Sequence, residues 1–132
     1  MLSVINLIIY DSKISTANIG IDYQTISAAK KFIENHYSEK IKLNDIAKSV
    51  NLSDIYFHKC FTLATGLTPH QYLMRCRIEN AKKLLWNSDM AMSGVAEKCG
   101  FCSQQHMNKI FKKETGMTPL QYRKNIQQNY LY

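Results

Sequence analysis

One segment occurs twice in this sequence, at an offset of fifty residues, and this repeat constrains the fold more than any other feature. The first copy reads FHKCFTLATGLTPHQY over residues 57–72, and the second reads MNKIFKKETGMTPLQY over residues 107–122. Half of the aligned positions are identical, and they include the only two prolines of the chain, Pro69 and Pro119. A chain that repeats one supersecondary unit is expected to build two small cores of the same kind.

Upstream of each copy, the pattern predicts a short helix, a tight turn and a second helix. Residues 43–50 (LNDIAKSV) place apolar side chains at helical spacing, and the same pattern precedes the second copy. Asn51 and Gly100 follow these short helices and are residue types that tolerate the left-handed backbone of a tight turn. Ser53 and Ser103 then stand where a residue can cap the next helix. Two helices joined in this way predict a helix-turn-helix unit, present twice.

The spacing of apolar residues predicts an all-α chain of about seven helices, with two helix-turn-helix subdomains joined by a long central helix. The second helix of each unit is predicted to bury a stripe made of Phe57, Cys60, Phe61 and Ala64 in the first copy and of Met107, Ile110 and Phe111 in the second. The predicted segments are an N-terminal extension over 1–22 and a bipartite domain over 23–132, which holds a first unit at about 41–66, a linker helix at about 69–86 and a second unit at about 92–116. The linker helix is expected to act as a rigid strut.

The charge lies almost entirely in the bipartite domain. The chain has 17 Lys and Arg against 10 Asp and Glu, a net charge of +7, and residues 23–132 carry 16 of the basic and 8 of the acidic groups. A strong positive charge at this size favours a polyanionic partner, either a nucleic acid or an anionic membrane surface. Several of the basic residues gather at the second unit: Lys109, Lys112, Lys113, Arg123 and Lys124.

The second helix of a helix-turn-helix unit enters the major groove with the face opposite its buried stripe. That face carries Ile55, His58 and Lys59 in the first copy, beside Asp54 and Thr62, and Gln104, Gln105, His106, Asn108, Lys109 and Lys112 in the second. Amides pair with adenine, lysine reaches guanine, and an apolar side chain can contact the thymine methyl group. The second face has no acid among its six residues, whereas the first fits an ordinary solvated helix surface nearly as well.

Residues 25–125 resemble the DNA-binding domain of the AraC/XylS family of bacterial transcription regulators. The matching positions are Ala96, Gly100-Phe101, Phe111-Lys112-Lys113, Gly116-Met117-Thr118-Pro119 and Tyr122-Arg123 in the second unit, Ile46-Ala47, Leu52-Ser53, Phe61, Gly66, Pro69 and Tyr72 in the first, and Arg77, Ala81, Leu84 and Leu85 in the linker helix. The resemblance implies a regulator, more often an activator that touches RNA polymerase than a repressor, whose two units contact adjacent major-groove segments. It further implies that base contacts fall on Ile55, His58 and Lys59, and on Gln104, Gln105, His106, Asn108 and Lys109.

Other properties are expected on the same basis. The protein is expected to bind double-stranded DNA as a monomer and to need no cofactor. The family often has Arg where Lys59 and Lys109 stand, and lysine lacks the rigid fork of arginine, so base discrimination at these positions is expected to be looser. Many family members carry a large N-terminal effector or dimerisation domain, which 22 residues are too few to form. The chain therefore resembles a short stand-alone regulator or a fragment of a longer one.

Two alternatives remain open beside DNA binding. Cys99 and Cys102 form a C-x-x-C pair, which elsewhere serves redox or zinc chemistry, although His106 is the only further zinc ligand nearby. A helical module that binds acidic partners is the other alternative. No spacing in the sequence predicts catalysis. The longest apolar stretch, residues 2–10, is too short to span a membrane, so a cytoplasmic protein with free thiols is expected.

Overall fold

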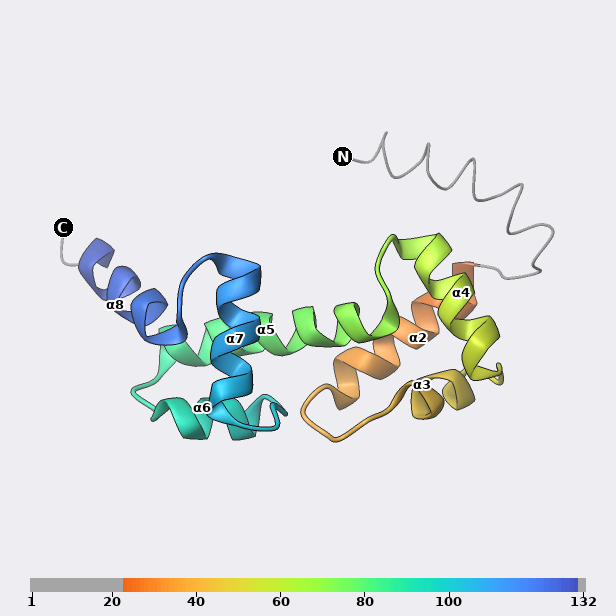
Figure 1. Ribbon diagram of the computed structural model, residues 1–132, viewed down its shortest axis with the longest axis horizontal. Coiled ribbons are helices and arrows are strands. Elements are labelled where there is room, and N and C mark those ends of the chain that lie inside the picture. Colours follow the sequence, from red (N-terminus) through yellow and green to blue (C-terminus); the bar gives the residue numbers. More distant parts are fainter. Residues whose placement is uncertain (1–22, 131–132) are drawn as a thin grey trace. The chain divides into compact units, whose positions relative to one another are not determined.

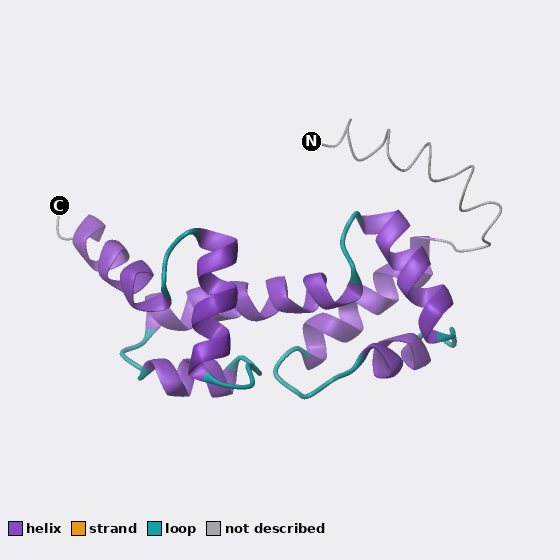
Figure 2. Cartoon of the chain, viewed as in Figure 1, coloured by secondary structure: helices purple, strands orange, loops and turns teal. Residues whose placement is uncertain are grey.

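The computed structural model describes residues 23–130, and over this range the chain consists only of helices and the loops between them (Figure 1, Figure 2). The helices are α2 (Tyr23–His36), α3 (Leu43–Ser49), α4 (Asp54–Thr65), α5 (Pro69–Asn87), α6 (Met92–Lys98), α7 (Gln104–Thr115) and α8 (Pro119–Tyr130). The predicted all-α fold with about seven helices is thus confirmed. The predicted N-terminal extension, residues 1–22, lies outside the described residues.

The chain divides into two compact units. Of the described residues, the first unit holds 23–36 and 41–72, and the second holds 37–40 and 73–130. Helix α5 is continuous over its 19 residues, and its first turn belongs to the first unit while the rest belongs to the second. The short loop that follows α2 is counted with the second unit, although it connects two helices of the first.

Each unit rests on a first helix that buries one apolar stripe. In α2 the stripe comprises Ile26, Ala29 and Ile33, and in α5 it comprises Ile78, Ala81 and Leu85, all at most 6% exposed. These positions correspond at an offset of 52 residues, and Ala-Lys-Lys occurs at both, at residues 29–31 and 81–83. The repeated element is therefore three helices long, one helix more than the repeat described from the sequence.

Helices α5 and α8 begin with the same capping arrangement. The backbone amide of Gln71 donates to the Thr68 hydroxyl at 3.1 Å, and the Thr68 amide donates to the Gln71 side chain at 3.0 Å. Thr118 and Gln121 make the equivalent pair at 3.2 Å and 2.9 Å. This reciprocal pattern is a capping box, with proline at the first helical position, and it satisfies two amides that the helix itself leaves free. The expected role of the two threonines as caps is confirmed.

The predicted core stripes of α4 and α7 are mostly buried. Phe57, Phe61, Met107 and Phe111 are fully buried, and Cys60 is 1% exposed. The prediction was wrong for two positions, which are half-buried: Ala64 and Ile110. The neighbouring helices cover the centre of each stripe and leave its margins partly open to solvent, and helical spacing alone does not show where that cover ends.

Candidate nucleic-acid interface

Both units contain the same tight turn between two helices. Asn51 follows α3 with a φ of 59°, and Gly100 follows α6 with a φ of 87°. In each case the next residue donates its backbone amide to the carbonyl oxygen of a buried alanine, Ala47 at 3.0 Å or Ala96 at 2.9 Å. A left-handed residue followed by this bond closes the end of a helix and redirects the chain. The turn thus brings α4 across α3 in the first unit and α7 across α6 in the second (Figure 1).

The two turns differ in how much room they leave for a side chain. A Cβ atom added at Gly100 would lie 2.6 Å from the carbonyl oxygen of Tyr37 and 3.0 Å from the Cα atom of Ser38. Both contacts are with backbone, which cannot move aside as a flexible side chain can. The turn of the second unit therefore requires glycine for steric as well as conformational reasons, whereas the first turn accommodates Asn51.

Helices α4 and α7 have matching starts and ends. Ser53 and Ser103 each accept a hydrogen bond from the backbone amide three residues further on, at 3.4 Å and 3.0 Å. Gly66 and Gly116 end the helices in the left-handed conformation, with φ of 77° and 80°. Both helices are 12 residues long. Helices α4 and α7 therefore have defined lengths and capped ends, which is what an element that reads a DNA groove requires.

On α4 the predicted contact residues are open to solvent. Ile55 is 85% exposed, and His58 and Lys59 are also exposed. An isoleucine this open is hardly packed against the described residues, so its exposure suits an apolar contact with a partner. Thr62 is half-buried, and its hydroxyl donates to the His58 carbonyl oxygen at 2.7 Å.

On α7 the six predicted residues separate into two groups. Four are exposed: Gln104, Gln105, Lys109 and Lys112. His106 and Asn108 are half-buried. The His106 ring packs edge-on against Phe101 with 5.8 Å between ring centroids, and its Nδ1 is buried without a hydrogen-bond partner among the described residues. The open face of α7 is therefore narrower than the sequence indicated, and His106 contributes to packing.

Two arginines prove to be internal clamps of the second unit. Arg77 is 5% exposed and donates from Nε to the Tyr37 carbonyl oxygen at 2.7 Å and from Nη2 to that of Glu39 at 2.9 Å. Burial lowers the pKa of this guanidinium from its usual range. Arg123 is half-buried and donates to the carbonyl oxygens of Leu85 and Met90, at 3.2 Å and 2.8 Å. Arg123 lies in the second unit, as expected, but backbone carbonyl oxygens bind its Nε and Nη1, one of them in α5 and the other in the loop that follows α5.

The C-x-x-C pair also separates into one buried and one open residue. Cys99 is 1% exposed, and burial raises the pKa of its thiol to about 11, although Lys98 and Arg77 act in the opposite direction. Cys102 is exposed in the turn. The repeat placed Cys99 at a buried apolar position and Cys102 near solvent, and both placements are confirmed.

We expect Cys99→Ser to destabilise the second unit by roughly 1–3 kcal/mol, because the substitution buries a hydroxyl group without a hydrogen-bond partner. Cys102→Ser serves as the matched control and should leave both stability and DNA binding unchanged. Urea unfolding followed by tryptophan fluorescence measures the first effect. Stoichiometric zinc by elemental analysis would refute this assignment. DNA binding that mild oxidant abolishes in the wild type but not in Cys102→Ser would refute it as well.

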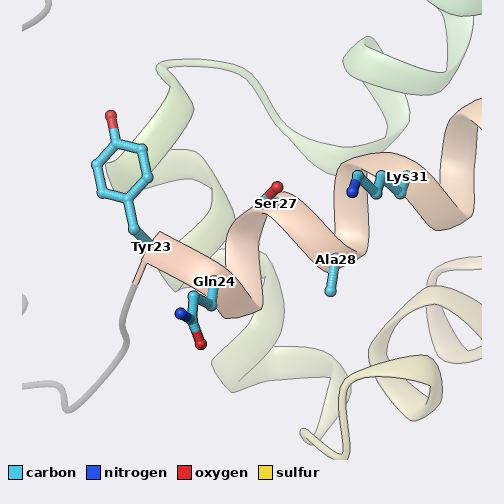
Figure 3. A pocket seen from close by; sticks show the side chains of 5 residues that line it. All are labelled: Tyr23, Gln24, Ser27, Ala28 and Lys31. Atoms are coloured by element: carbon cyan, nitrogen blue, oxygen red, sulfur yellow. The ribbon is translucent and has the colours of Figure 1, made fainter.

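An open hollow lies along α2. Five side chains line it, and Figure 3 shows them on successive turns of this one helix: Tyr23, Gln24, Ser27, Ala28 and Lys31. They are a phenol, an amide, a hydroxyl, a methyl group and a single amine. Among these five described residues there is no acid, thiol or imidazole.

The described residues hold neither a cluster of metal ligands nor a membrane-spanning helix. Between residues 23 and 130, no three His, Cys, Asp or Glu side chains converge in a way that could hold a metal ion. Among the same helices, none is both long and apolar enough to cross a membrane.

Known proteins match this chain over the same region. A family model described as a helix-turn-helix domain matches residues 46–125. The Msm operon regulatory protein of Streptococcus mutans is 33% identical over 104 residues, which cover 79% of this chain and 37% of that protein. The transcriptional activator RhaS of Escherichia fergusonii is 35% identical over 92 residues, covering 70% of this chain and 33% of that protein. The chain thus spans about a third of the length of the curated relatives it matches.

Solved structures share the fold. The DNA-binding domain of AdpA, a global transcriptional factor crystallised with a target DNA, superposes with a TM-score of 0.75 at 27% identity, covering 79% of this chain and 94% of that one. The C-terminal domain of AraT, a response regulator from Geobacillus stearothermophilus, superposes with a TM-score of 0.73 at 27% identity, covering 76% of this chain and 84% of that one.

Proposed function

Since the chain belongs to the AraC-type family of helix-turn-helix transcription regulators, we propose that it binds double-stranded DNA in a sequence-specific manner and activates transcription. The observation that carries the proposal is the exposed face of α7. Two amides and two lysines stand there on a capped helix, with no acid among the six predicted contact residues. Amides read adenine and lysines read guanine or bind phosphate, so this face has the chemistry of a major-groove reader.

The two units are proposed to act in series on one duplex. Helix α4 presents Ile55, His58 and Lys59 to one major-groove segment, and α7 presents its amides and lysines to an adjacent one. RhaS, one of the relatives named above, is a transcriptional activator. By analogy, we propose that this protein activates transcription through contact with RNA polymerase. We further propose that it acts as a monomer in the bacterial cytoplasm. Stimulation of transcription by purified RNA polymerase from a promoter that carries the bound sequence tests this part.

The decisive experiment is selection of bound duplexes from a random DNA pool, because the selection itself reveals the target sequence. Enrichment of one motif supports sequence-specific binding. Recovery of a random set, or tighter binding to an acidic polypeptide than to any duplex, would favour the interaction module for acidic partners instead.

Two variants of α7 test the assignment of base and phosphate contacts. Gln105 lies in the first turn of the helix, where base edges are read, whereas Lys112 lies about two turns further on and is better placed for phosphate. We expect Gln105→Ala to cost ~1–3 kcal/mol on the selected duplex and little on others. Lys112→Ala should weaken binding to every duplex alike. It should also reduce the slope of log affinity against log salt concentration by about one.

Fluorescence anisotropy with the selected duplex and a scrambled duplex of equal length measures both effects. Lys124→Ala is a suitable control for loss of one exposed positive charge, because this residue lies on α8 and outside both predicted contact faces. If Gln105→Ala weakened the selected and scrambled duplexes equally, the role of Gln105 as a base reader would be refuted.

A further inference from the structure

The two units carry unequal charge, although they are copies of one design. Among the described residues of the first unit, five basic groups stand against three acidic ones, a net charge of +2. The second unit has eleven against five, a net charge of +6. The difference extends to the capped helices: α4 has one acid and one lysine, whereas α7 has three lysines and one acid. Non-specific attraction to phosphates should therefore come mainly from the second unit.

The acid on α4 stands at the position where base edges are read. Asp54 is the first residue of α4, directly after the Ser53 cap and beside Ile55. At the corresponding position of the repeat, α7 has a neutral amide, Gln104. The N-terminal residues of such a helix are the ones that contact bases in the groove. At the N-terminal ends of α4 and α7, the one difference in charge is therefore Asp54 against Gln104. This difference falls on a position that contacts bases in such helices.

A neighbouring helix holds this carboxylate in place. The Asn44 side chain, on α3, donates from Nδ2 to Oδ1 of Asp54 at 3.0 Å. The second oxygen, Oδ2, has no hydrogen-bond partner among the described residues, and Asp54 is only half-buried. One oxygen thus has a partner on α3, and the other remains available as a hydrogen-bond acceptor.

Such an acceptor discriminates strongly between the groups of a DNA duplex. A carboxylate is repelled by phosphates and by the acceptors N7 and O6 of guanine and O4 of thymine, and it pairs with the exocyclic amino group of cytosine. Adenine also has an amino group, but its N7 acceptor lies beside that group and repels the second carboxylate oxygen. Cytosine is therefore the base that best satisfies a fixed carboxylate in the major groove.

We propose that Asp54, positioned by Asn44, is a specificity-determining residue that accepts a hydrogen bond from cytosine N4 and disfavours docking of α4 on other DNA. The inference rests on the proposed function, because it assigns a base to one residue of the same interface. Under this inference the two units have different roles. The second unit supplies most of the attraction to phosphates, and the first unit binds only where Asp54 meets an amino group of a base.

The test compares Asp54→Asn with Asp89→Asn, which removes the same charge from an exposed residue in the loop between α5 and α6. The wild-type protein is first used to select duplexes from a random pool, and affinities are then measured at 50 mM salt. We expect one cytosine in the selected motif whose replacement weakens the wild type by fivefold or more and weakens Asp54→Asn by less than twofold. Asp54→Asn should also bind scrambled DNA several-fold more tightly, with the gain fading at high salt.

A second variant keeps the inference testable if the asparagine also reads cytosine. Asp54→Gln copies the residue of the second unit, and an amide pairs with adenine, so adenine should replace cytosine at that position in a new selection. Retention of the cytosine in both variants, or an equal gain on scrambled DNA for Asp89→Asn, would overturn the role of Asp54. Failure of the wild-type protein to enrich any motif would instead refute the proposed function itself.

Discussion

Raising the salt concentration from 50 to 200 mM should weaken DNA binding by a factor of roughly 10³ or more. Residues 23–132 carry a net charge of +8, and a protein that neutralises several phosphates releases the same number of condensed counterions. The contributing residues are the exposed lysines, Lys109 and Lys112 of α7 among them. The two arginine clamps, Arg77 and Arg123, donate to carbonyl oxygens of their own unit and should contribute little. Anisotropy titrations over this range give the slope of log affinity against log salt.

Two controls separate this effect from a change in the protein. The melting temperature of the free protein should stay nearly constant over the same salt range, because no buried ion pair supports the described helices. Lys112→Gln, at the residue placed for phosphate, should reduce the slope by about one. A flat plot in the wild type would contradict binding through phosphates.

Phe111→Ala should unfold the second unit or bring it close to unfolding. The ring is fully buried and packs edge-on against Tyr122, with 5.3 Å between centroids. Removing a buried phenylalanine costs about 3–5 kcal/mol through lost burial and the cavity left behind, against a total of ~5–15 kcal/mol for a typical domain. The chain has one tryptophan, Trp86, and it lies in the second unit. Urea unfolding followed by its fluorescence therefore reports on the unit that the substitution affects.

Leu120→Ala is the matched control, because Leu120 lies one residue after the start of α8 and is 49% exposed. Its loss should change the free energy of unfolding by less than about 0.5 kcal/mol. DNA affinity of Phe111→Ala should fall sharply at temperatures where the variant is unfolded. An unchanged urea midpoint in Phe111→Ala would show that the packing of α7 against α8 does not support the unit.

The sequence alone determined the elements whose cause is local. Ser53 and Ser103 cap their helices, threonine and proline start α5 and α8, and a left-handed residue ends each short helix, as predicted. Each of these depends on groups within about five residues, so a repeated local pattern was enough to find them. The repeat also separated Cys99 from Cys102 correctly, because corresponding positions of two copies have the same burial.

Only the tertiary structure decided which of the basic and polar side chains that could contact DNA are accessible at the surface. The sequence placed Arg123 among the basic residues of the second unit, but it did not show that this side chain binds carbonyl oxygens 33 and 38 residues earlier in the chain. His106 was one of six polar residues on α7 until the structure placed its ring on Phe101. The helices α2 and α5 were expected, but the sequence did not show that they correspond as the first helix of the repeat, since outside the Ala-Lys-Lys segment they are matched mainly by burial.

The bond between Asn44 and Asp54 shows the physical reason most clearly. Ten residues and a turn separate the two side chains, and they meet only because α3 and α4 cross at a particular angle and register. Helical periodicity predicts which face of one helix is apolar, but it contains no information about how that helix sits on the next. Local sequence therefore determined the helices, their ends and the candidate reading face, whereas the packing of helix on helix decided which charges are clamped, which are free and which are held in place.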